Sequence, residues 1–563
     1  MLLSLSAIDR YLRALELDLV AFLPELLLCM AIVFLLVLRL TKMTDRWHMG
    51  EVSFIITLLA LLVSWCQWSG YGEEYGLFTP LDIDVISKQH EMFSGLLVYD
   101  NFTIFLRMFL IGFAALVIWL SLLTGIPERE DSADFCVLLL GATVGMSLMA
   151  SANHLLMVFI AVEMASVPSY ALAGFLKTKR QSSEASLKYV VYGGGAAGVM
   201  LFGISLIAGT FGTGYLPDVA KGFVAVLHEG SDPSQKMVLL LGTLFVLIGV
   251  MFKIAAVPFH FWCPDVFEGA ATEVAAFLSV ASKGAALALL ARFAFVLSGL
   301  AALTTRHYAS WHEIAQFLIP GLAFLAALTA TFGNLAAFPQ TNLKRLLAYS
   351  TIAHAGYMMM GLATLSKEGA GAVLFYLVAY LFMNLGAFAI VAFLRNQTGS
   401  EDLNDYRGLI YRAPLMTVLL AVFLLSLLGI PPLAGFAAKF QIFRVLYDAG
   451  NSYSTHGDVS LGYTMYALLV VGGINTVISA VYYLKVMKVM ILERSLEELE
   501  GEEPEPLPVT PGSAFYGMLL AGMIFFVGIF WNPLARATDA GVNRFYKAPR
   551  PMSQATAQQV KPS

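Results

Sequence analysis

Long apolar runs separated by short polar segments dominate the sequence. Fourteen of them approach or exceed the roughly 20 residues that a helix needs to cross the hydrocarbon core of a bilayer. The second run is short, and only a four-residue corner separates the fourth from the fifth. The pattern predicts an all-α polytopic membrane protein with about 14 transmembrane helices. The runs are 22–38, 54–68, 102–123, 135–150, 155–175, 187–208, 237–261, 274–297, 317–338, 343–365, 370–394, 413–447, 463–489 and 513–531.

The composition supports a membrane location. Of the 563 residues, 58% are hydrophobic and only 13% are charged, whereas soluble domains have about 45–50% apolar and about 25% charged residues. The net charge of -5 and the lack of a basic run with interleaved aromatics argue against nucleic-acid binding. Because the four cysteines lie far apart without a CxxC pair, we expect no metal site and no redox cofactor in this chain.

Lysine and arginine residues in the loops predict the orientation of the helices. Loops after odd-numbered helices carry 15 of them, whereas the N-terminus and the loops after even-numbered helices carry 8. Since basic loops stay on the inner side of the membrane, this ratio places both termini on the outer side. Five basic residues in the tail after residue 535 oppose this assignment.

Once basic residues near the span ends are assigned to loops, six basic residues remain inside the predicted spans, and Glu163 is the one acid near a span centre. A charge at the bilayer centre costs about 2.5–3.5 kcal/mol on insertion scales, so such residues usually mark ion or proton pathways. An arginine is effectively never deprotonated, and we interpret the two arginines as structural anchors. The seven residues are Arg107, Glu163, Lys188, Lys253, Lys283, Arg292 and Lys439.

Glu163 and the lysines are the candidates for proton transfer. A buried carboxylate and a buried ammonium group stabilise each other's charged form, so a proton entering the site shifts both equilibria. The alternatives for Glu163 are a protonated isolated acid or a pair that only holds helices together. For Lys188, four residues after Glu184, an ion pair on the helix surface or snorkelling competes with a buried role.

Two predicted helices are interrupted close to a lysine. Pro258 follows Lys253 by five residues, and Pro431-Pro432 precede Lys439 in the other half of the chain. Proline frees a backbone carbonyl, which is tolerable in lipid only where protein or water satisfies it. An ordinary kink would explain one such helix. Two of them suggest an internal repeat of about five helices with a transporter-type site.

Histidines in or beside the spans are further candidates, because imidazole can pass protons between neighbours. His354 lies within one and a half turns of Tyr349 and two other hydroxyl side chains, which together could hold a water chain. His154 and His260 stand alone. For each histidine, an interhelical hydrogen bond is the competing interpretation.

Six segments of the sequence resemble the proton-pumping membrane-arm subunits of respiratory complex I, an antiporter-like family. They occur in the family's order between about residues 135 and 490 and are IAVEMASVPSYALAGF, SSEASLKYVVYG, MFKIAAVPFHFWCPDVFEGA, FLSVASKGAA, NLKRLLAYSTIAHAGYMMMG and GIPPLAGFAAKF. The resemblance implies fourteen helices, with helices 4–8 and 9–13 forming two inverted repeats and helices 7 and 12 broken. The corresponding divisions are 1–134 for helices 1–3, 135–297 and 317–490 for the repeats, 491–512 for an acidic Pro-rich linker, and 513–563 for helix 14 and the tail.

The resemblance also implies roles for the candidate residues. Glu163 and Lys253 would form the first half-channel, Lys283 the central relay, and Lys439 the residue that exchanges with the outer half-channel. Supporting positions on a hydrated polar axis would be Lys188, His260, His354 and Tyr349. Lys439 separates the chain from subunit M, which has glutamate on helix 12, and we expect no lateral helix like that of subunit L. Ala271 replaces the family's usual proline, which leaves the shape of the following loop open.

The implied function is proton translocation through this chain, driven by quinone reduction elsewhere in an NADH-quinone oxidoreductase. The complex would use FMN, iron–sulfur clusters and a quinone, and subunits M and K would be neighbours in the bacterial inner (plasma) membrane. Two other functions fit the same residues: an Mrp-type cation/proton antiporter, and a structural scaffold whose buried charges only lock helices together. Sodium-dependent proton exchange without redox partners would favour the antiporter.

Overall fold

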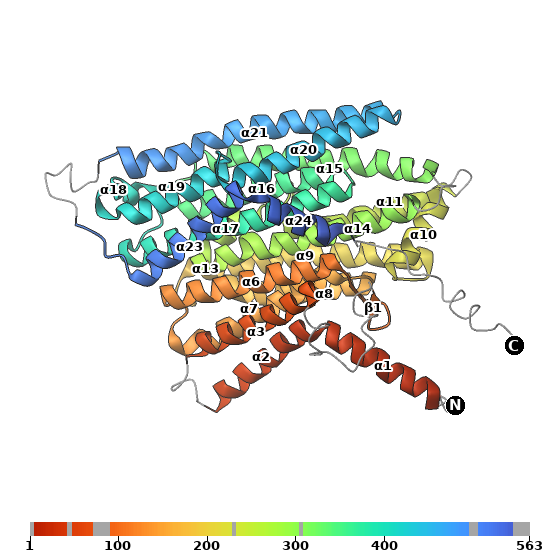
Figure 1. The fold of residues 1–563 in the computed structure, drawn as a ribbon, viewed down its shortest axis with the longest axis horizontal. Helices are drawn as coiled ribbons and strands as arrows, with labels where there is room; N and C mark the ends of the chain where they lie inside the picture. The colour runs from red at the N-terminus through yellow and green to blue at the C-terminus, as the bar shows by residue number, and fades with distance from the viewer. Residues whose placement is uncertain are drawn as a thin grey trace.

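The computed structural model describes residues 5–41, 48–70, 90–227, 232–302, 308–494 and 505–543. Its long helices run side by side in one elongated bundle, with α2 at one edge and α21 at the opposite edge (Figure 1). Helix α1 (Leu5–Ala21) points away from the bundle. Residues 495–504 of the acidic linker and 544–563 of the tail lie outside the described residues.

All fourteen predicted runs coincide with helical segments, which confirms the all-α polytopic fold. Twelve helices among the described residues are long and apolar enough to cross a membrane, and Pro414–Leu428 is a shorter apolar helix. The segments are α2 (Leu23–Leu40), α3 (Met49–Ser69), α6 (Asn101–Thr124), α7 (Ser132–Ser151), α8 (Leu155–Ala173), α9 (Arg180–Phe211), α11 (Pro233–Ile254) with α12 (Trp262–Gly269), α13 (Thr272–Phe277) with η3 (Leu278–Ser282) and α14 (Lys283–Ala302), α15 (Tyr308–Ala337), α16 (Leu343–Leu362), α17 (Lys367–Thr398), α19 (Pro414–Leu428) with α20 (Ala434–Thr455), α21 (Val459–Leu492) and α23 (Pro511–Ile529).

Several short elements connect the spans and were not predicted, because a search for long apolar runs passes over short or amphipathic segments. Two strands form an antiparallel hairpin in which His90 pairs with Tyr99. These elements are β1 (His90–Met92), β2 (Leu97–Tyr99), η2 (Arg129–Asp131), α10 (Leu216–Leu227), η4 (Leu403–Tyr406), α18 (Leu409–Arg412) and α24 (Trp531–Asn543).

Both predicted helix breaks are confirmed. Helix α11 ends at Ile254, the next residue Ala255 has a left-handed backbone with φ of 61°, and α12 begins at Trp262. In the second break α19 is followed by Gly429, whose φ is 94°. Gly435 in α20 lies so close to α19 that a Cβ atom there would overlap the carbonyl oxygen of Ser426. The two halves of each broken helix therefore stay in contact across an irregular segment.

The C-terminal helices close the bundle by returning to its N-terminal part. Helix α23 packs on α17, and α24 packs on both α6 and α17. The Tyr516 hydroxyl donates to the carbonyl of Leu116 at 2.9 Å, and the Asn101 amide donates to the carbonyl of Ala540 at 3.1 Å. Helix α6 is thereby buried between segments that are far apart in the sequence.

Candidate functional site

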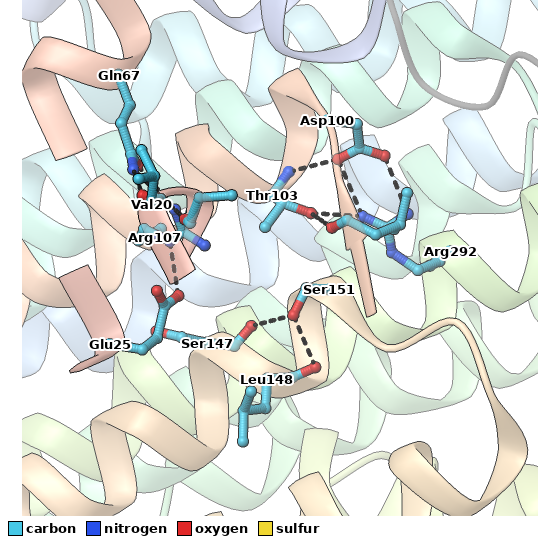
Figure 2. Close-up of polar contacts among 12 residues, drawn as sticks. Val20, Glu25, Gln67, Asp100, Thr103, Arg107, Ser147, Leu148, Ser151 and Arg292 are labelled. Atoms are coloured by element: carbon cyan, nitrogen blue, oxygen red, sulfur yellow. Dashed lines mark hydrogen bonds and ion pairs between the residues drawn. The ribbon is translucent and has the colours of Figure 1, made fainter. Parts of the chain in front are cut away.

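Arg107 on α6 is fully buried and fully paired (Figure 2). Its Nε lies 2.6 Å from Oε1 of Glu25 on α2. The same guanidinium group donates to the carbonyl of Ala21 at 2.9 Å and to Oε1 of Gln67 at 2.8 Å. This arginine joins the first three spans, as expected of a structural anchor.

Arg292 on α14 has the same character. Its Nη1 lies 3.0 Å from Oδ2 of Asp100, and both side chains are completely buried. Its Nε donates to the carbonyl of Ala150 at 2.7 Å, and Thr103 accepts a further hydrogen bond (Figure 2). These hydrogen bonds tie α14 to α6 and α7.

Lys253 and Glu163 face each other across α11 and α8 without forming a close pair. Lys253 is buried in the last turn of α11, and its Nζ lies 5.6 Å from the ring centroids of both Tyr170 and Tyr189. Glu163 is half-buried, and its Oε1 has no hydrogen-bond partner among the described residues. The two charges interact electrostatically, but within the described chain no ion pair of 4.0 Å or less joins them. The two charges are therefore coupled without a direct contact.

Lys283 is completely buried directly after the π-helical turn η3. Such turns occur frequently at functional sites. Its Nζ lies 3.6 Å from Sγ of Cys263 and faces the rings of Trp262 at 5.4 Å and Phe267 at 5.0 Å. In the part of the chain that the structure describes, no carboxylate pairs with this ammonium group.

Lys439 on α20 makes a contact that depends on the helix break. Its Nζ donates to the carbonyl of Leu428 at 2.8 Å. Leu428 is the last residue of α19, so the break frees this carbonyl. The ammonium group also lies 4.8 Å from the centroid of the Tyr357 ring. Here too the lysine is buried against aromatic and backbone groups.

His354 is held by tyrosines from two other helices. Its Nδ1 lies 2.7 Å from the Tyr376 hydroxyl and its Nε2 lies 3.2 Å from the Tyr483 hydroxyl. The Tyr483 hydroxyl in turn forms a hydrogen bond with the Ser350 hydroxyl, with the two oxygens 2.5 Å apart. Tyr349 instead packs half-buried against the apolar core. Sequence reasoning missed Tyr376 and Tyr483 because both are more than 20 residues away from the histidine.

The other two histidines have different surroundings. His260 is buried between the rings of Phe261 and Phe332, with centroids at 4.4 and 4.5 Å. Its Nδ1 has no partner among the described residues, so its surroundings are aromatic where the resemblance implied a polar axis. His154 caps α8, because its Nδ1 accepts a hydrogen bond from the N–H of Leu156 at 3.1 Å. Burial lowers the pKa of His154.

Lys188 belongs to an ionic cluster near the start of α9. Its Nζ lies 2.8 Å from Glu184 and 2.7 Å from Asp265, and 37% of its side chain is exposed. Arg345 joins Asp265 and Glu268 at 2.7 Å each. Burial opposes ionisation of Asp265, but hydrogen bonds and ion pairs with Lys188 and Arg345 outweigh it and lower the pKa of this carboxyl. The cluster lines a hollow of about 180 Å³.

A second ionic cluster was not predicted, because its basic residues were assigned to loops. Lys344 lies 2.9 Å from Glu401, and Arg395 lies 3.2 Å from Glu273. Lys344, Arg395 and Glu273 are buried in the structure. These pairs join α13, α16 and α17 just after Ala271, where the sequence departs from the family pattern.

A larger hollow of about 500 Å³ opens at the C-terminal end of α20. A second hollow of about 160 Å³ shares Glu368, Val445 and Asp448 with it. The larger hollow is lined by Thr364, Ser366, Glu368, Val445, Asp448, Ala449, Ser452, Tyr453, His456 and Asp458. Its walls are therefore strongly acidic, and it lies beyond Lys439 on the same helix.

Aromatic and thiol side chains connect the three buried lysines. The Tyr189 ring next to Lys253 stacks on the Trp262 ring next to Lys283. On the other side, Tyr380 lies near Cys263 and 5.1 Å from the ring of His354. A polytopic helix bundle with two broken helices and buried lysines beside both breaks is the fold of an antiporter-like membrane protein.

Comparisons with known proteins support this class. The family described as NADH:quinone oxidoreductase/Mrp antiporter matches residues 152–459. NADH-quinone oxidoreductase subunit N of Anaeromyxobacter sp. (strain Fw109-5) is 40% identical over 81% of this chain and 86% of that protein. A chain of respiratory complex I from Thermus thermophilus with bound aureothin is 28% identical, with a TM-score of 0.68, and the match covers 92% of this chain and 100% of that chain.

The Mrp complex from Dietzia sp. DQ12-45-1b contains a chain with a TM-score of 0.75 but only 18% identity, over 94% of this chain and 98% of that one. This likeness concerns the fold alone. The chain belongs to the subunit N family of NADH-quinone oxidoreductases, the antiporter-like membrane subunits of respiratory complex I. It is accordingly a multi-pass, proton-translocating subunit of the membrane arm. Among the described residues no group of histidines, cysteines and carboxylates could hold a metal ion.

Proposed function

We propose that protons cross this chain along Glu163, Lys253, Lys283 and Lys439, driven by quinone reduction elsewhere in the complex. The observation that carries the proposal is the set of three lysines buried on α11, α14 and α20 without a carboxylate within ion-pair distance among the described residues. A buried ammonium group without a counter-ion is costly. Each lysine can therefore take up and release a proton as neighbouring charges change.

The hollow of about 180 Å³ beside Lys188 and the hollow of about 500 Å³ at the end of α20 would be the two ends of this path. Lys188 and its ionic cluster line the smaller hollow at the start of α9, and Glu368 and Asp448 line the larger one beyond Lys439. Successive spans alternate in direction, so the two hollows open at opposite ends of the bundle. Lys188 thus belongs to the entrance on the inner side, and Lys439 exchanges protons with the outer side.

The loose pairing of Glu163 and Lys253 supplies the switch. A change of charge in a neighbouring subunit would draw Glu163 away from Lys253. Loss of the opposite charge disfavours the ammonium form, so the proton of Lys253 passes to Lys283. From there Cys263, Tyr380 and His354 form the route toward Lys439.

The surroundings of the subunit follow from its family. We propose that subunits M and K are its neighbours and that FMN and iron–sulfur clusters of the complex deliver electrons to the quinone. The chain would lie in a bacterial inner membrane with both termini on the outer side. The ratio of basic residues in its loops supports this orientation.

Two substitutions test the path in the assembled complex. Lys253→Ala or Glu163→Ala should abolish the share of NADH-driven proton pumping that runs through this chain, because each removes one member of the pair. The measurement is proton uptake by vesicles that contain the complex, normalised to NADH oxidation. Lys221→Ala is the matched control, since that lysine pairs with Asp218 on the surface of the protein.

The outcome also separates the competing functions. Pumping that persists in both variants, with the subunit present in the complex, would contradict the path. Unchanged pumping after neutralisation of Glu163 and all three buried lysines would leave only a scaffold role.

A further inference from the structure

Tyr189 on α9 is a completely buried polar residue that the path described above does not use. Its hydroxyl has no hydrogen-bond partner among the described residues. Leaving a buried hydroxyl unpaired is unfavourable, because the group loses its hydrogen bonds to water without replacement. Each such group in a native protein calls for an explanation, and a proton path is one.

The ring of Tyr189 separates two of the proposed proton carriers. It stacks on the Trp262 ring with centroids 4.3 Å apart and planes inclined by only 7°. Lys253 lies 5.6 Å from the centroid of the Tyr189 ring, and Lys283 lies 5.4 Å from the centroid of the Trp262 ring. The stack thus stands between the two ammonium groups.

The hydroxyl of Tyr189 interacts with groups on both sides of this stack. Tyr170 lies beside Lys253, whereas Cys263 and Ser282 lie on the Lys283 side, and none of the three completes a hydrogen bond with it. Ser282 is the last residue of η3 and directly precedes Lys283, while Cys263 contacts the ammonium group of Lys283 at 3.6 Å. One phenol therefore touches the surroundings of both lysines.

We propose that Tyr189 is a proton relay between Lys253 and Lys283. The inference rests on the proposed function, because it needs both lysines to carry protons. The ammonium group of Lys253 gives one proton to the phenol oxygen, directly after rotation of its flexible stem or through one water. The phenol releases its own proton toward neutral Lys283, which becomes an ammonium group. Lys253 is left as a neutral amine, and Tyr189 is again a neutral phenol.

The position of the stack gives the relay a second property. The stacked rings of Tyr189 and Trp262 leave no room for water on the direct line between the lysines. Transfer then requires the hydroxyl itself. Removal of this single oxygen should block the step while the ring remains in place.

The decisive variant is Tyr189→Phe, which keeps the stack on Trp262 and removes only the hydroxyl. In the assembled complex in vesicles, proton pumping through this subunit per NADH oxidised should fall at least about 100-fold, the low end of what a proton-transfer group contributes. The amount of subunit in the complex should not change. The solvent deuterium isotope effect on the residual pumping should rise, which a purely structural role would not cause.

Tyr516→Phe is the matched control. Tyr516 is also completely buried, but its hydroxyl donates to the carbonyl of Leu116, away from the lysines. This variant should pump like the parent chain. Equal pumping by the Tyr189→Phe variant and the parent chain would overturn the relay. If Lys253→Ala and Lys283→Ala nevertheless abolish pumping, the proposed function stands without it, whereas pumping that survives all three substitutions contradicts both.

Discussion

Individual buried charges in this protein are of two kinds, and their partners tell them apart. Arg107 and Arg292 have a carboxylate at 2.6 and 3.0 Å and further oxygens around them. In contrast, Lys253, Lys283 and Lys439 face rings, a thiol or a backbone carbonyl. A fully paired charge is fixed in one state, whereas a lysine without a counter-ion can alternate between two states. Pairing therefore separates structural from proton-carrying residues.

The Arg292–Asp100 pair should be critical for stability. Arg292→Met leaves Asp100 as an uncompensated buried charge, which should cost about 3–5 kcal/mol. The melting temperature of the purified complex and the amount of subunit in it would both fall. Lys177→Met is the control, because the pair of Lys177 with Asp131 is mostly exposed and should contribute less than about 1 kcal/mol.

Replacing both members of the pair provides the counter-test. Arg292→Met combined with Asp100→Leu removes the two charges together, so it should be milder than Arg292→Met alone. A double variant as unstable as the single one would show that the hydrogen bonds to Ala150 and Thr103 carry most of the stability.

At this scale the sequence could predict the charged residues but not their partners. The six basic residues inside spans are visible as interruptions of apolar runs. Their partners lie up to 192 residues away, as Asp100 does from Arg292, and spacing within a helix carries no information about them. Lys344 and Arg395 were assigned to loops because they lie near helix ends. The acids that pair with them come from elsewhere, Glu401 from the segment after α17 and Glu273 from α13.

Among the elements, the broken helices were the most predictable, because proline cannot donate a backbone hydrogen bond. The residues at which the chain changes direction were less predictable. Ala255 adopts a left-handed backbone that alanine rarely occupies, and the π-helical turn before Lys283 has no marker in the sequence. Packing against neighbouring helices decides such local conformations. Sequence reasoning therefore finds a break but not its geometry.

Gly435 provides a test of the second break. Gly435→Ala places a methyl group against the carbonyl of Ser426, so α19 and α20 must move apart. The contact between Lys439 and the carbonyl of Leu428 should be lost, and pumping per NADH should fall severalfold while electron transfer continues.

Gly473→Ala on α21 is the matched control, since nothing lies within 4 Å of its added methyl group. That change should leave pumping intact and be neutral or stabilising by up to about 1 kcal/mol. Normal pumping by the Gly435→Ala variant would show that the precise contact of the two half-helices is dispensable.

For the whole molecule, the order and number of spans could be predicted because each span is a long apolar run. The arrangement of the spans could not be derived from hydropathy, and the resemblance to a family supplied it. The packing of α24 against the N-terminal part of the bundle was not predicted, because this helix is short and amphipathic. Its partners on α6 and α17 are separated from it by long stretches of chain.

The orientation of the bundle can be tested by labelling single cysteines in a chain whose native cysteines are replaced. Lys367→Cys precedes the larger hollow and should react with a membrane-impermeant maleimide added outside intact cells. Lys177→Cys should react only after the membrane is opened. Both side chains are exposed, so access to the reagent is the only difference. The reverse labelling pattern would invert the proposed inlet and outlet.

The hydrogen bond between Asn101 and Ala540 joins two parts of the chain that are synthesised at different times. Its partners are 439 residues apart, which a ribosome needs roughly 20–90 s to translate at about 5–20 residues per second. During that interval α6 is already in the membrane, and the surface that α24 will cover is open to lipid, insertion factors and proteases. Only a chain translated through α24 can seal that surface. The packing around α6 is therefore complete only after α24 has been translated.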